Sequence, residues 1–454
     1  MNDTSDAWRP YEPSDAAPWN CKRVVHLHRR AGFAATWPEI EQDLADGPQR
    51  AVDRLIKPKP DRERAESFEA MARTIGDAAA ASNSPNRLKA WWLYRMLFSP
   101  DPLGERLTLM WHNHFATSNR KVQDLELMRQ QNELIRENAR APFGQLLAAV
   151  VKHPAMLVWL DADANRKGKA NENLAREMLE LFTLGIGHYT ESDVQAAARA
   201  LTGWAVIDGH FGVRDARHDS ESKTFLGTTG PLTGDNLLTI VTQDPATARR
   251  LAWRICHTFL GEAKVGDDSL NTLADGIRKR NLDIGWAVET VLRSQLFFDG
   301  ATLHNRVAGP VEWAVGAVRA LELLNPPPST LLLAEWTTRM GQDLFYPPNV
   351  GGWSEGRAWL GSQSIVARSN FAAALVTGQL WYPKRETDLR PLVKRYVKTS
   401  EVHDSVTWIA ELLWGDANHD AVSEIVAAAE PAKPDARLST AVALLLARPE
   451  SQLS

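Results

Sequence analysis

Cysteine is scarce in this 454-residue chain, which contains only Cys21 and Cys256. Two cysteines form no disulfide framework and show no metal-type pair spacing, and they give no information on the cellular compartment. Long apolar runs are missing too. None approaches the roughly 18 residues that a membrane span requires, so no membrane-spanning helix is expected.

Several short catalytic signatures are also absent. The chain has no P-loop, no dinucleotide fingerprint, no zinc-protease helix and no Gly-x-Ser-x-Gly nucleophile elbow. The reaction classes that these motifs identify are therefore not indicated here.

The charge is nearly balanced, with 52 Lys and Arg against 56 Asp and Glu and a formal net charge of -4. No basic stripe with interleaved aromatic residues occurs, so nucleic acid is not expected as a partner. The first 20 residues are acidic, contain proline and lack the basic-then-apolar pattern of an export signal. The sequence as given predicts a cytoplasmic protein.

Apolar residues are abundant and make up 44% of the chain. Helical periodicity predicts an all-α fold, with many helices in one domain. One small β-hairpin is expected near 204–213, where Asp208-Gly209 supplies the turn. The stretch 218–234 that follows it is expected to be a loop. We expect a flexible arm over 1–19, a main helical domain over 20–380 and a helical tail over 381–454, packed on or appended to that domain.

Tryptophan is frequent, with 17 residues. Most tryptophans are expected to be buried anchors, because the indole buries a large area. Trp353 and Trp359 stand beside glycines in an expected loop, so they are better candidates for lining a groove.

The segment 157–204 concentrates carboxylates beside apolar residues. On a helix that starts near Asn171, Glu177 falls between apolar neighbours and is expected to be partly desolvated. Arg176 is four residues from both Glu172 and Glu180 and is expected to neutralise them. Glu177 is then either a functional carboxyl or half of a buried ion pair, for which Arg199 is the nearest donor.

The loop before that helix has the oxygen spacing of a calcium loop. Asp161, Asp163, Asn165 and Glu172 occupy the ligand positions, so a divalent metal ion such as calcium is one interpretation. Arg166 replaces the turn glycine, and nearby lysines add positive charge. The alternative is an Asx-rich turn that caps the helix.

Two groups of histidines are candidate functional residues. His112 and His114 are two residues apart, about 200° around a helix, so both cannot hold one ion; His114 is expected to face the core. His218 and Asp219 form a His-acid pair in an expected loop, with Lys223 four residues on. Such a pair is typical of a proton shuttle.

The motifs resemble a bacterial family catalogued as domain of unknown function 1800. The resemblance rests on RRAGFAAT (29–36), MWHNHFATS (110–118), the block 160–204, HDSESKTFLG (218–227) and PPNVGGWSEGRAWL (347–360). It implies a mainly helical domain of no established activity. Members often look exported, which makes a periplasmic location the alternative, and are frequently encoded beside sulfatase-like or phosphatase-like proteins. This chain departs from them in lacking a recognisable signal.

The family's recurrent polar positions carry no assigned role. In this sequence they fall on His112, His114, Asp161, Asn165, Asn171, Glu172, Asn173, Arg176, Glu177, Glu180, Arg199, His218, Asp219, Lys223 and Asn349.

Two hypotheses about function follow. The first is a hydrolase or lyase acting on a saccharide-like substrate through paired carboxylates and histidines, with a metal-assisted variant. Its catalytic candidates are Glu177, Glu180, His218, Asp219 and His112, and its substrate-binding candidates are Trp204, Lys223, Asn349, Trp353, Arg176 and Arg199. The second is a non-enzymatic binding or assembly module, in which the polar cluster is a structural ion-pair network and the partner is a sulfatase-like or phosphatase-like protein.

Overall fold

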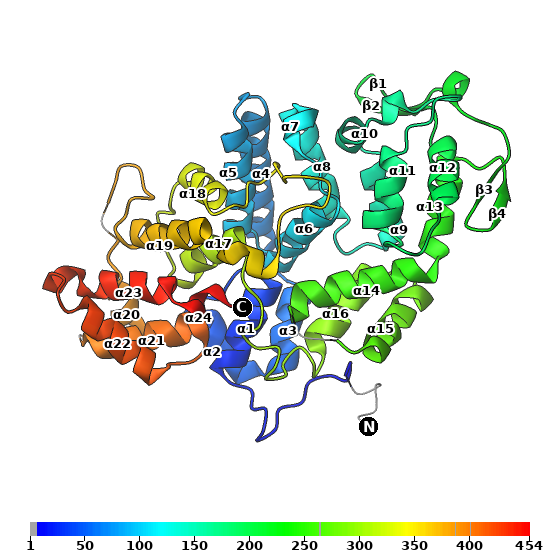
Figure 1. Cartoon of the computed structure of the whole chain (residues 1–454). Helices are drawn as coiled ribbons and strands as arrows, with labels where there is room; N and C mark the ends of the chain where they lie inside the picture. Colours follow the sequence, from blue (N-terminus) through cyan, green and yellow to red (C-terminus); the bar gives the residue numbers. More distant parts are fainter. Residues whose placement is uncertain (1–6, 263–264, 386, 400) are drawn as a thin grey trace.

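The fold is mainly helical, as predicted. The computed structural model describes residues 7–262, 265–385, 387–399 and 401–454. These residues form 24 α-helices, a few shorter helical turns and two small antiparallel sheets. The helices fall into a central group, one wing to the right and one to the left (Figure 1).

The central group is built by the first third of the chain (Figure 1). Its helices are α1 (Cys21–Ala31), α2 (Trp37–Asp46), α3 (Pro48–Ile56), α4 (Arg62–Ala80), α5 (Pro85–Phe98), α6 (Pro102–His114), α7 (Asn119–Val122) and α8 (Leu125–Glu137).

The right wing follows in sequence (Figure 1). Its helices are α9 (Phe143–Val151), α10 (Pro154–Trp159), α11 (Asn173–Glu177), which continues as a π-helical turn (Met178–Phe182), α12 (Glu191–Ala200), α13 (Gly234–Gln243), α14 (Pro245–Leu260), α15 (Asp267–Lys279) and α16 (Ile284–Arg293).

The left wing contains the rest of the chain (Figure 1). Its helices are α17 (Pro310–Ala320), α18 (Thr330–Arg339), α19 (Ser362–Val376), α20 (Arg390–Tyr396), α21 (Val402–Trp414), α22 (His419–Ala429), α23 (Arg437–Ala447) and α24 (Pro449–Gln452).

Many helices begin where the sequence supplies a cap. Asp101 accepts a hydrogen bond from the backbone N–H of Gly104 at 2.9 Å, and proline follows it at the first position of α6. Thr190 and Asp193 form a reciprocal capping box at the start of α12. These caps satisfy backbone donors that a helix start leaves free, which fixes where each helix begins.

Two hydrophobic cores meet along α1 and α6. Val24 and Val25 of α1 belong to the core of the left wing, whereas Leu27 of the same helix belongs to the core of the right wing. On α6, Leu109 packs into the first core and Trp111 into the second. These two helices therefore place their polar residues at the boundary between the cores.

Both ends of the described chain are packed against the rest. Of the arm expected over 1–19, residues 1–6 lie outside the described part. Tyr11 is buried, and the indole of Trp8 donates to the backbone oxygen of Ser269 at 2.8 Å. At the other end, Arg29 of α1 donates to the backbone oxygens of Leu413 and Ser451 at 3.0 and 2.7 Å, which ties the tail to α1.

The predicted hairpin is confirmed. Strand β1 (Trp204–Ile207) pairs with β2 (His210–Val213), and Asp208 and Gly209 take the positive φ angles of a two-residue turn. A second hairpin, β3 (Lys223–Phe225) with β4 (Thr228–Gly230), lies where only loop was expected. Its strands have three residues each, and Leu226 takes a positive φ that is uncommon for such a side chain.

Within the part of the chain that the structure describes, no helix is both long and apolar enough to cross a membrane.

Replacing Glu105 by Gln tests the packing of α5, α6 and α8. Glu105 is 1% exposed and accepts from Arg95 at 2.9 Å and from Arg136 at 2.7 Å. We expect Glu105→Gln to lower the free energy of unfolding by about 3 kcal/mol or more, because two buried guanidinium groups lose their shared anion. Urea unfolding measures this. The exposed pair of Arg62 and Glu66 provides the control, Glu66→Gln, for which we expect a change within about 0.5 kcal/mol. Equal effects would contradict the assignment.

Candidate functional site

The expected carboxylate helix is interrupted. The α-helical part ends at Glu177, and the next five residues form a π-helical turn in which the Thr183 hydroxyl donates to the Met178 backbone oxygen at 2.6 Å. A π-turn shifts the side-chain direction relative to a regular helix, so Glu180 does not continue the predicted stripe.

Glu177 has a perturbed environment. Burial and the neighbouring Glu180 carboxylate raise its pKa. Among the described residues it has no ion-pair partner, and Glu180 accepts a hydrogen bond from the Tyr189 hydroxyl at 3.1 Å. The expected cation partners lie elsewhere: Arg176 pairs with Glu172 at 2.8 Å and with Glu191 rather than with Glu180. Arg199 pairs with Asp219 at 2.7 Å rather than with Glu177.

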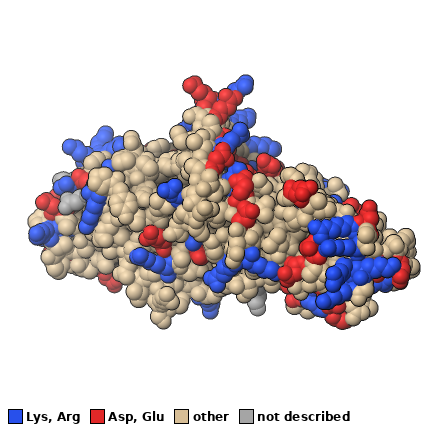
Figure 2. Space-filling view, turned by 90° about the horizontal axis from the view of Figure 1, so that it is seen from above, with Lys and Arg blue, Asp and Glu red and all other residues tan. Residues whose placement is uncertain are grey.

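The acidic loop before α11 is already neutralised by cations. Asp161 lies 2.7 Å from the Lys121 ammonium, and Asp163 lies 2.8 Å from Arg214. Asn165 is buried and accepts from the Asn171 backbone N–H at 2.9 Å, and Asn171 accepts from the Asn173 backbone N–H at 3.0 Å, which is an Asx turn. Lys, Arg, Asp and Glu are mixed at this end of the molecule (Figure 2).

A hard dication needs several uncompensated oxygens. Across the described ranges, no group of three or more His, Cys, Asp or Glu side chains is placed to hold a metal ion. With their charges met by Lys121, Arg214 and Arg176, the four candidate ligands Asp161, Asp163, Asn165 and Glu172 do not fit a calcium site.

Both histidines of α6 are buried. His112 contacts the Asn132 amide nitrogen through Nε2 at 2.9 Å and packs against Trp92. His114 contacts the Phe182 backbone oxygen through Nε2 at 3.0 Å. Burial lowers both pKa values to about 3, with nearby arginines adding to the effect. The core position expected for His114 is confirmed, and His112 is equally enclosed.

His218, Asp219, Arg199 and Lys223 form hydrogen bonds that connect the segments next to the two hairpins. His218 contacts the Thr202 backbone oxygen through Nδ1 at 2.9 Å, and Asp219 accepts from Arg199. Lys223 is 3% exposed and donates to two backbone oxygens, of Asp219 and Leu232. The structure therefore brings His218, Asp219, Arg199 and Lys223 together. Glu180 lines a separate surface groove, with a volume of about 370 Å³, beside His188, Arg250 and Trp253.

A polar hollow lies where the two cores meet, with about 360 Å³ of space that includes its open mouth. The predicted groove-lining role of Trp353 and Trp359 agrees with their place in its wall. Asn349 is not a wall residue; its side chain accepts from the Gly351 backbone N–H and shapes the loop. The polar wall residues are Arg106, Asn113, Thr258, Arg306, Glu312, Gln342, Ser354 and Glu355.

Glu312 is the buried carboxylate of this hollow. It accepts two hydrogen bonds from Arg306, at 2.5 and 2.9 Å, and lies 3.0 Å from the guanidinium of Arg106. Burial alone would raise its pKa, but Arg106 and Arg306 lower it to about 2. Three more arginines, Arg29, Arg30 and Arg368, interact electrostatically with the same carboxylate.

Positive charge exceeds negative charge around the hollow. Arg254 pairs with Glu355, so six arginines lie near two glutamates; of the six, only Arg106 and Arg306 line the hollow, and Arg29, Arg30 and Arg368 donate to backbone or amide oxygens behind it. Burial lowers the pKa of Arg106 and of Arg368 to about 10. Near the hollow, the buried guanidinium nitrogens of described residues that have no hydrogen-bond acceptor are Nε of Arg30, Arg254 and Arg368, and Nη2 of Arg106. Nη2 of Arg106 lies close to the Glu312 carboxylate, but its orientation does not allow a hydrogen bond.

Glu355 orients a histidine beside the hollow. It accepts from Asn113 at 2.7 Å and from Arg254 at 3.2 Å, and lies 3.1 Å from His257 Nε2. Burial would raise the pKa of Glu355, but Arg254 and His257 hold it far below its usual range. About a third of the His257 side chain is exposed. An imidazole held by a carboxylate can exchange protons with a bound molecule.

The loop that carries Glu355 reaches α6 through a glycine. Gly352 has φ +90°, and a Cβ there would lie 2.2 Å from the Asn113 side-chain oxygen. The next backbone N–H, of Trp353, donates to that oxygen at 2.6 Å. Only a residue without a side chain lets the loop approach so closely.

Sequence reasoning missed most of this hollow. Asn113 stands between the two singled-out histidines, and Glu355 lies two residues after Trp353, so both were within motifs that drew attention. The sequence around Arg106, Arg306 and Glu312 does not indicate that they are buried together. The residues that flank a buried arginine along the chain are of the same types as those that flank an exposed one.

Comparison with known families shows to which family the chain belongs. The profile of a family described as "Protein of unknown function (DUF1800)" matches residues 26–453. The chain therefore belongs to this family, and the resemblance seen in its motifs is confirmed. Comparison with curated proteins and with solved structures finds no match.

Replacing Glu177 by Gln separates a structural role from a functional one. A raised folded-state pKa means that the charged form of Glu177 is unfavourable in the folded state at neutral pH. We expect Glu177→Gln to have an equal or higher Tm than the parent at pH 7, with the difference shrinking as the pH falls toward 4.5. Calorimetry at both pH values measures this. A fall of several degrees at pH 7 would instead assign Glu177 to a structural ion pair.

Buried histidines make stability depend on pH. His112 and His114 have folded pKa values of about 3 and an unfolded value near 6.5. Between these values only the unfolded state takes up the protons, so the free energy of unfolding falls as the pH drops below about 6.5, by up to about 1.4 kcal/mol per unit for each histidine. We expect His112→Gln to reduce the pH dependence of the free energy of unfolding between pH 6 and 4. The reduction corresponds to the uptake of about one proton fewer on unfolding. The matched change at exposed His403 should leave the slope unaltered; equal slopes in all three proteins would refute the assignment.

Proposed function

We propose that this member of the DUF1800 family binds a small anionic ligand, with a carboxylate, phosphate or sulfate group, in the central hollow. The observation that carries the proposal is the sharing of two glutamates by six arginines at the boundary of the cores. Buried charge without a partner destabilises a protein by several kcal/mol per ion. These arginines already have hydrogen-bond or ion-pair partners, and a bound anion would add a further negative charge among them.

The chemistry of the wall matches such a ligand. A guanidinium group offers a planar fork of N–H donors that fits carboxylate and phosphate oxygens. Arg106 forms part of the wall, and its Nη2, which is ion-paired with Glu312 at 3.0 Å, makes no hydrogen bond. Neutral groups, Asn113, Thr258 and Ser354, stand in the same wall and can fix the orientation of the ligand.

One observation favours turnover of the ligand in addition to binding. His257 is partly exposed beside the hollow and is held by Glu355, which is itself fixed by Asn113 and Arg254. This arrangement supports a hydrolase or lyase that moves a proton at the bound molecule.

The other expectations stay predictions. A saccharide substrate handled by Glu177 and Glu180 has a possible location in the groove that Glu180 lines. A binding or assembly role beside a sulfatase-like or phosphatase-like partner, and a cytoplasmic or periplasmic location, are neither supported nor opposed by the geometry.

Titration with simple anions tests the proposal. We expect phosphate, sulfate or acetate to bind with a rise in Tm at constant ionic strength, because a ligand that binds only the folded state stabilises it. The variant Ser354→Asp places a carboxylate at the mouth of the hollow. We expect it to weaken anion binding at least tenfold while leaving the Tm without added anion equal or higher, since the new charge faces excess arginine. Calorimetric titration gives both values.

The control is Ser362→Asp, the same change at an exposed residue outside the hollow. It should bind anions like the parent chain. If the parent protein binds none of the three anions, or if Ser354→Asp binds them as tightly as the parent, the hollow is not an anion site.

A further inference from the structure

The surface groove of the right wing has room for a small molecule. It has a volume of about 370 Å³ and lies between the segment that follows α11 and the helices α14 and α15 (Figure 1). This volume is at the lower end of the range of about 300–1,000 Å³ that is typical of small-molecule sites. Its apolar wall residues are Leu181, Leu184, Ile186, Ala246, Trp253 and Leu270.

Two of these apolar side chains are exposed to water. Ile186 is 78% exposed and Trp253 is 39% exposed. Ile186 stands between Gly185 and Gly187, which both have positive φ angles, so this tight turn carries the isoleucine at the surface. A ligand that covers Ile186 would remove apolar surface from water, which favours binding.

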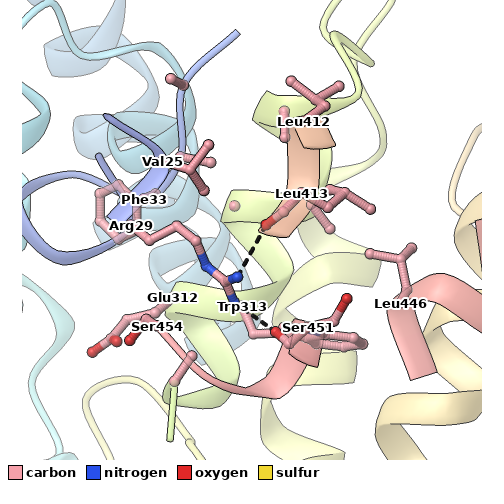
Figure 3. A pocket seen from close by; sticks show the side chains of 16 residues that line it. Val25, Arg29, Phe33, Glu312, Trp313, Leu412, Leu413, Leu446, Ser451 and Ser454 are labelled. Carbon is pink, nitrogen blue, oxygen red and sulfur yellow. Dashed lines mark hydrogen bonds between the residues drawn. The ribbon is translucent and has the colours of Figure 1, made fainter. Parts of the chain in front are cut away.

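Arg250 gives the groove a positive charge that no acceptor meets. Its guanidinium lies over the Trp253 ring, 4.9 Å from the centroid, and among the described residues it forms neither a hydrogen bond nor an ion pair. Arg29, by contrast, donates to the backbone oxygens of Leu413 and Ser451 (Figure 3). The planar fork of Arg250 is therefore available to a carboxylate.

Glu180 gives the same groove a negative charge. Its carboxylate accepts from the Tyr189 hydroxyl and pairs with no cation of the described chain. Repulsion between Glu180 and the nearby Glu177 contributes to the raised pKa of Glu177, so this end of the groove lacks a cation. Glu180 and Arg250 do not form an ion pair with each other, which leaves both to a ligand between them.

We infer that the groove binds an α-amino acid with a branched aliphatic side chain, such as leucine. The ammonium group of the ligand donates to Glu180, its carboxylate accepts from Arg250, and its side chain covers Ile186. Both polar contacts are charge-assisted hydrogen bonds, which are the strong ones in proteins. The inference concerns a second site and does not depend on anion binding in the central hollow.

The surroundings of Trp253 favour an amino acid over a saccharide. Arg250 lies one turn before this residue on α14 and His257 one turn after it, and the His257 ring stacks on the indole with 5.1 Å between centroids. The two side chains cover both faces of the indole, so only its edge is exposed. A sugar ring that stacks on an aromatic side chain needs an open face.

Analogues of leucine test the inference. L-Leucine, isocaproate, which lacks the ammonium group, and isoamylamine, which lacks the carboxylate, are titrated calorimetrically into the full chain. We expect leucine to bind at least tenfold more tightly than either analogue, because each analogue leaves one charged side chain of the groove without a counterion. Glycine, which has both charges and no apolar side chain, should also bind more weakly. The series is repeated with Ser354→Asp, so that binding of isocaproate in the central hollow is not counted.

Two variants assign the charged contacts. Arg250→Gln removes a guanidinium that has no hydrogen bond to lose, and Glu180→Gln keeps an acceptor for Tyr189. We expect each to weaken leucine binding at least tenfold. Arg250→Gln should also abolish the preference for leucine over isoamylamine, and Glu180→Gln the preference over isocaproate. The matched controls, Arg62→Gln and Glu66→Gln on the exposed face of α4, should bind leucine like the parent.

The outcomes separate this site from the alternatives. If leucine does not bind, or if both groove variants keep their preferences among the analogues, the amino-acid site is ruled out. Binding of glucuronate without binding of leucine would assign the groove to a saccharide instead. If Ser354→Asp weakens leucine binding as much as Arg250→Gln does, leucine binds in the hollow and the inference is wrong. Leucine binding that is lost in Arg250→Gln and kept in Ser354→Asp supports the groove, even if the hollow binds no simple anion.

Discussion

The electrostatic balance around Glu312 is the constraint on which the centre of the molecule depends. One carboxylate, almost fully buried, faces arginines from α1, α6, the segment before α17, and α19. Removing it would leave several buried guanidinium groups without their common partner, which is far more destabilising than losing a surface pair. Segments more than 300 residues apart are thereby fixed relative to one another.

This polar centre lies between two apolar cores, and that location carries the functional argument. A buried ion pair adds little net stability compared with apolar packing, so a polar seam through the middle of a fold is an unusual way to gain stability. It is, however, a good way to hold donors in fixed directions around a space. The arginines around Glu312 and the oriented His257 both occur at this one boundary, whereas Asp161, Asp163 and Glu172 of the acidic segment are paired with Lys121, Arg214 and Arg176.

Much of the fold could be predicted from sequence because its signals are local. Periodicity predicted the mainly helical fold, and Asp208-Gly209 located the first hairpin. The second hairpin was missed because its strands are too short to show alternation, and the π-turn after Glu177 shifted Glu180 off the expected stripe. His112 was expected to point away from the inward face of α6, but that helix is buried on nearly all sides. Trp353 lines a groove as expected, whereas the arginine partners were not foreseen, since pairing between residues such as Arg106 and Glu312 is decided by the tertiary fold alone.

The sharing of α1 and α6 by two cores also bears on how the chain reaches its native state during synthesis. The core of the left wing combines valines of α1 with residues of α21 and α23, such as Ile409 and Leu445, so this core stays incomplete until the last fifth of the polypeptide has left the ribosome. Until then α1 exposes apolar surface that only the right wing can partly cover. Contacts between segments that are far apart in sequence form slowly, so folding intermediates expose apolar surface for longer and are prone to aggregate. Chains shortened before α21 should therefore keep this apolar surface exposed.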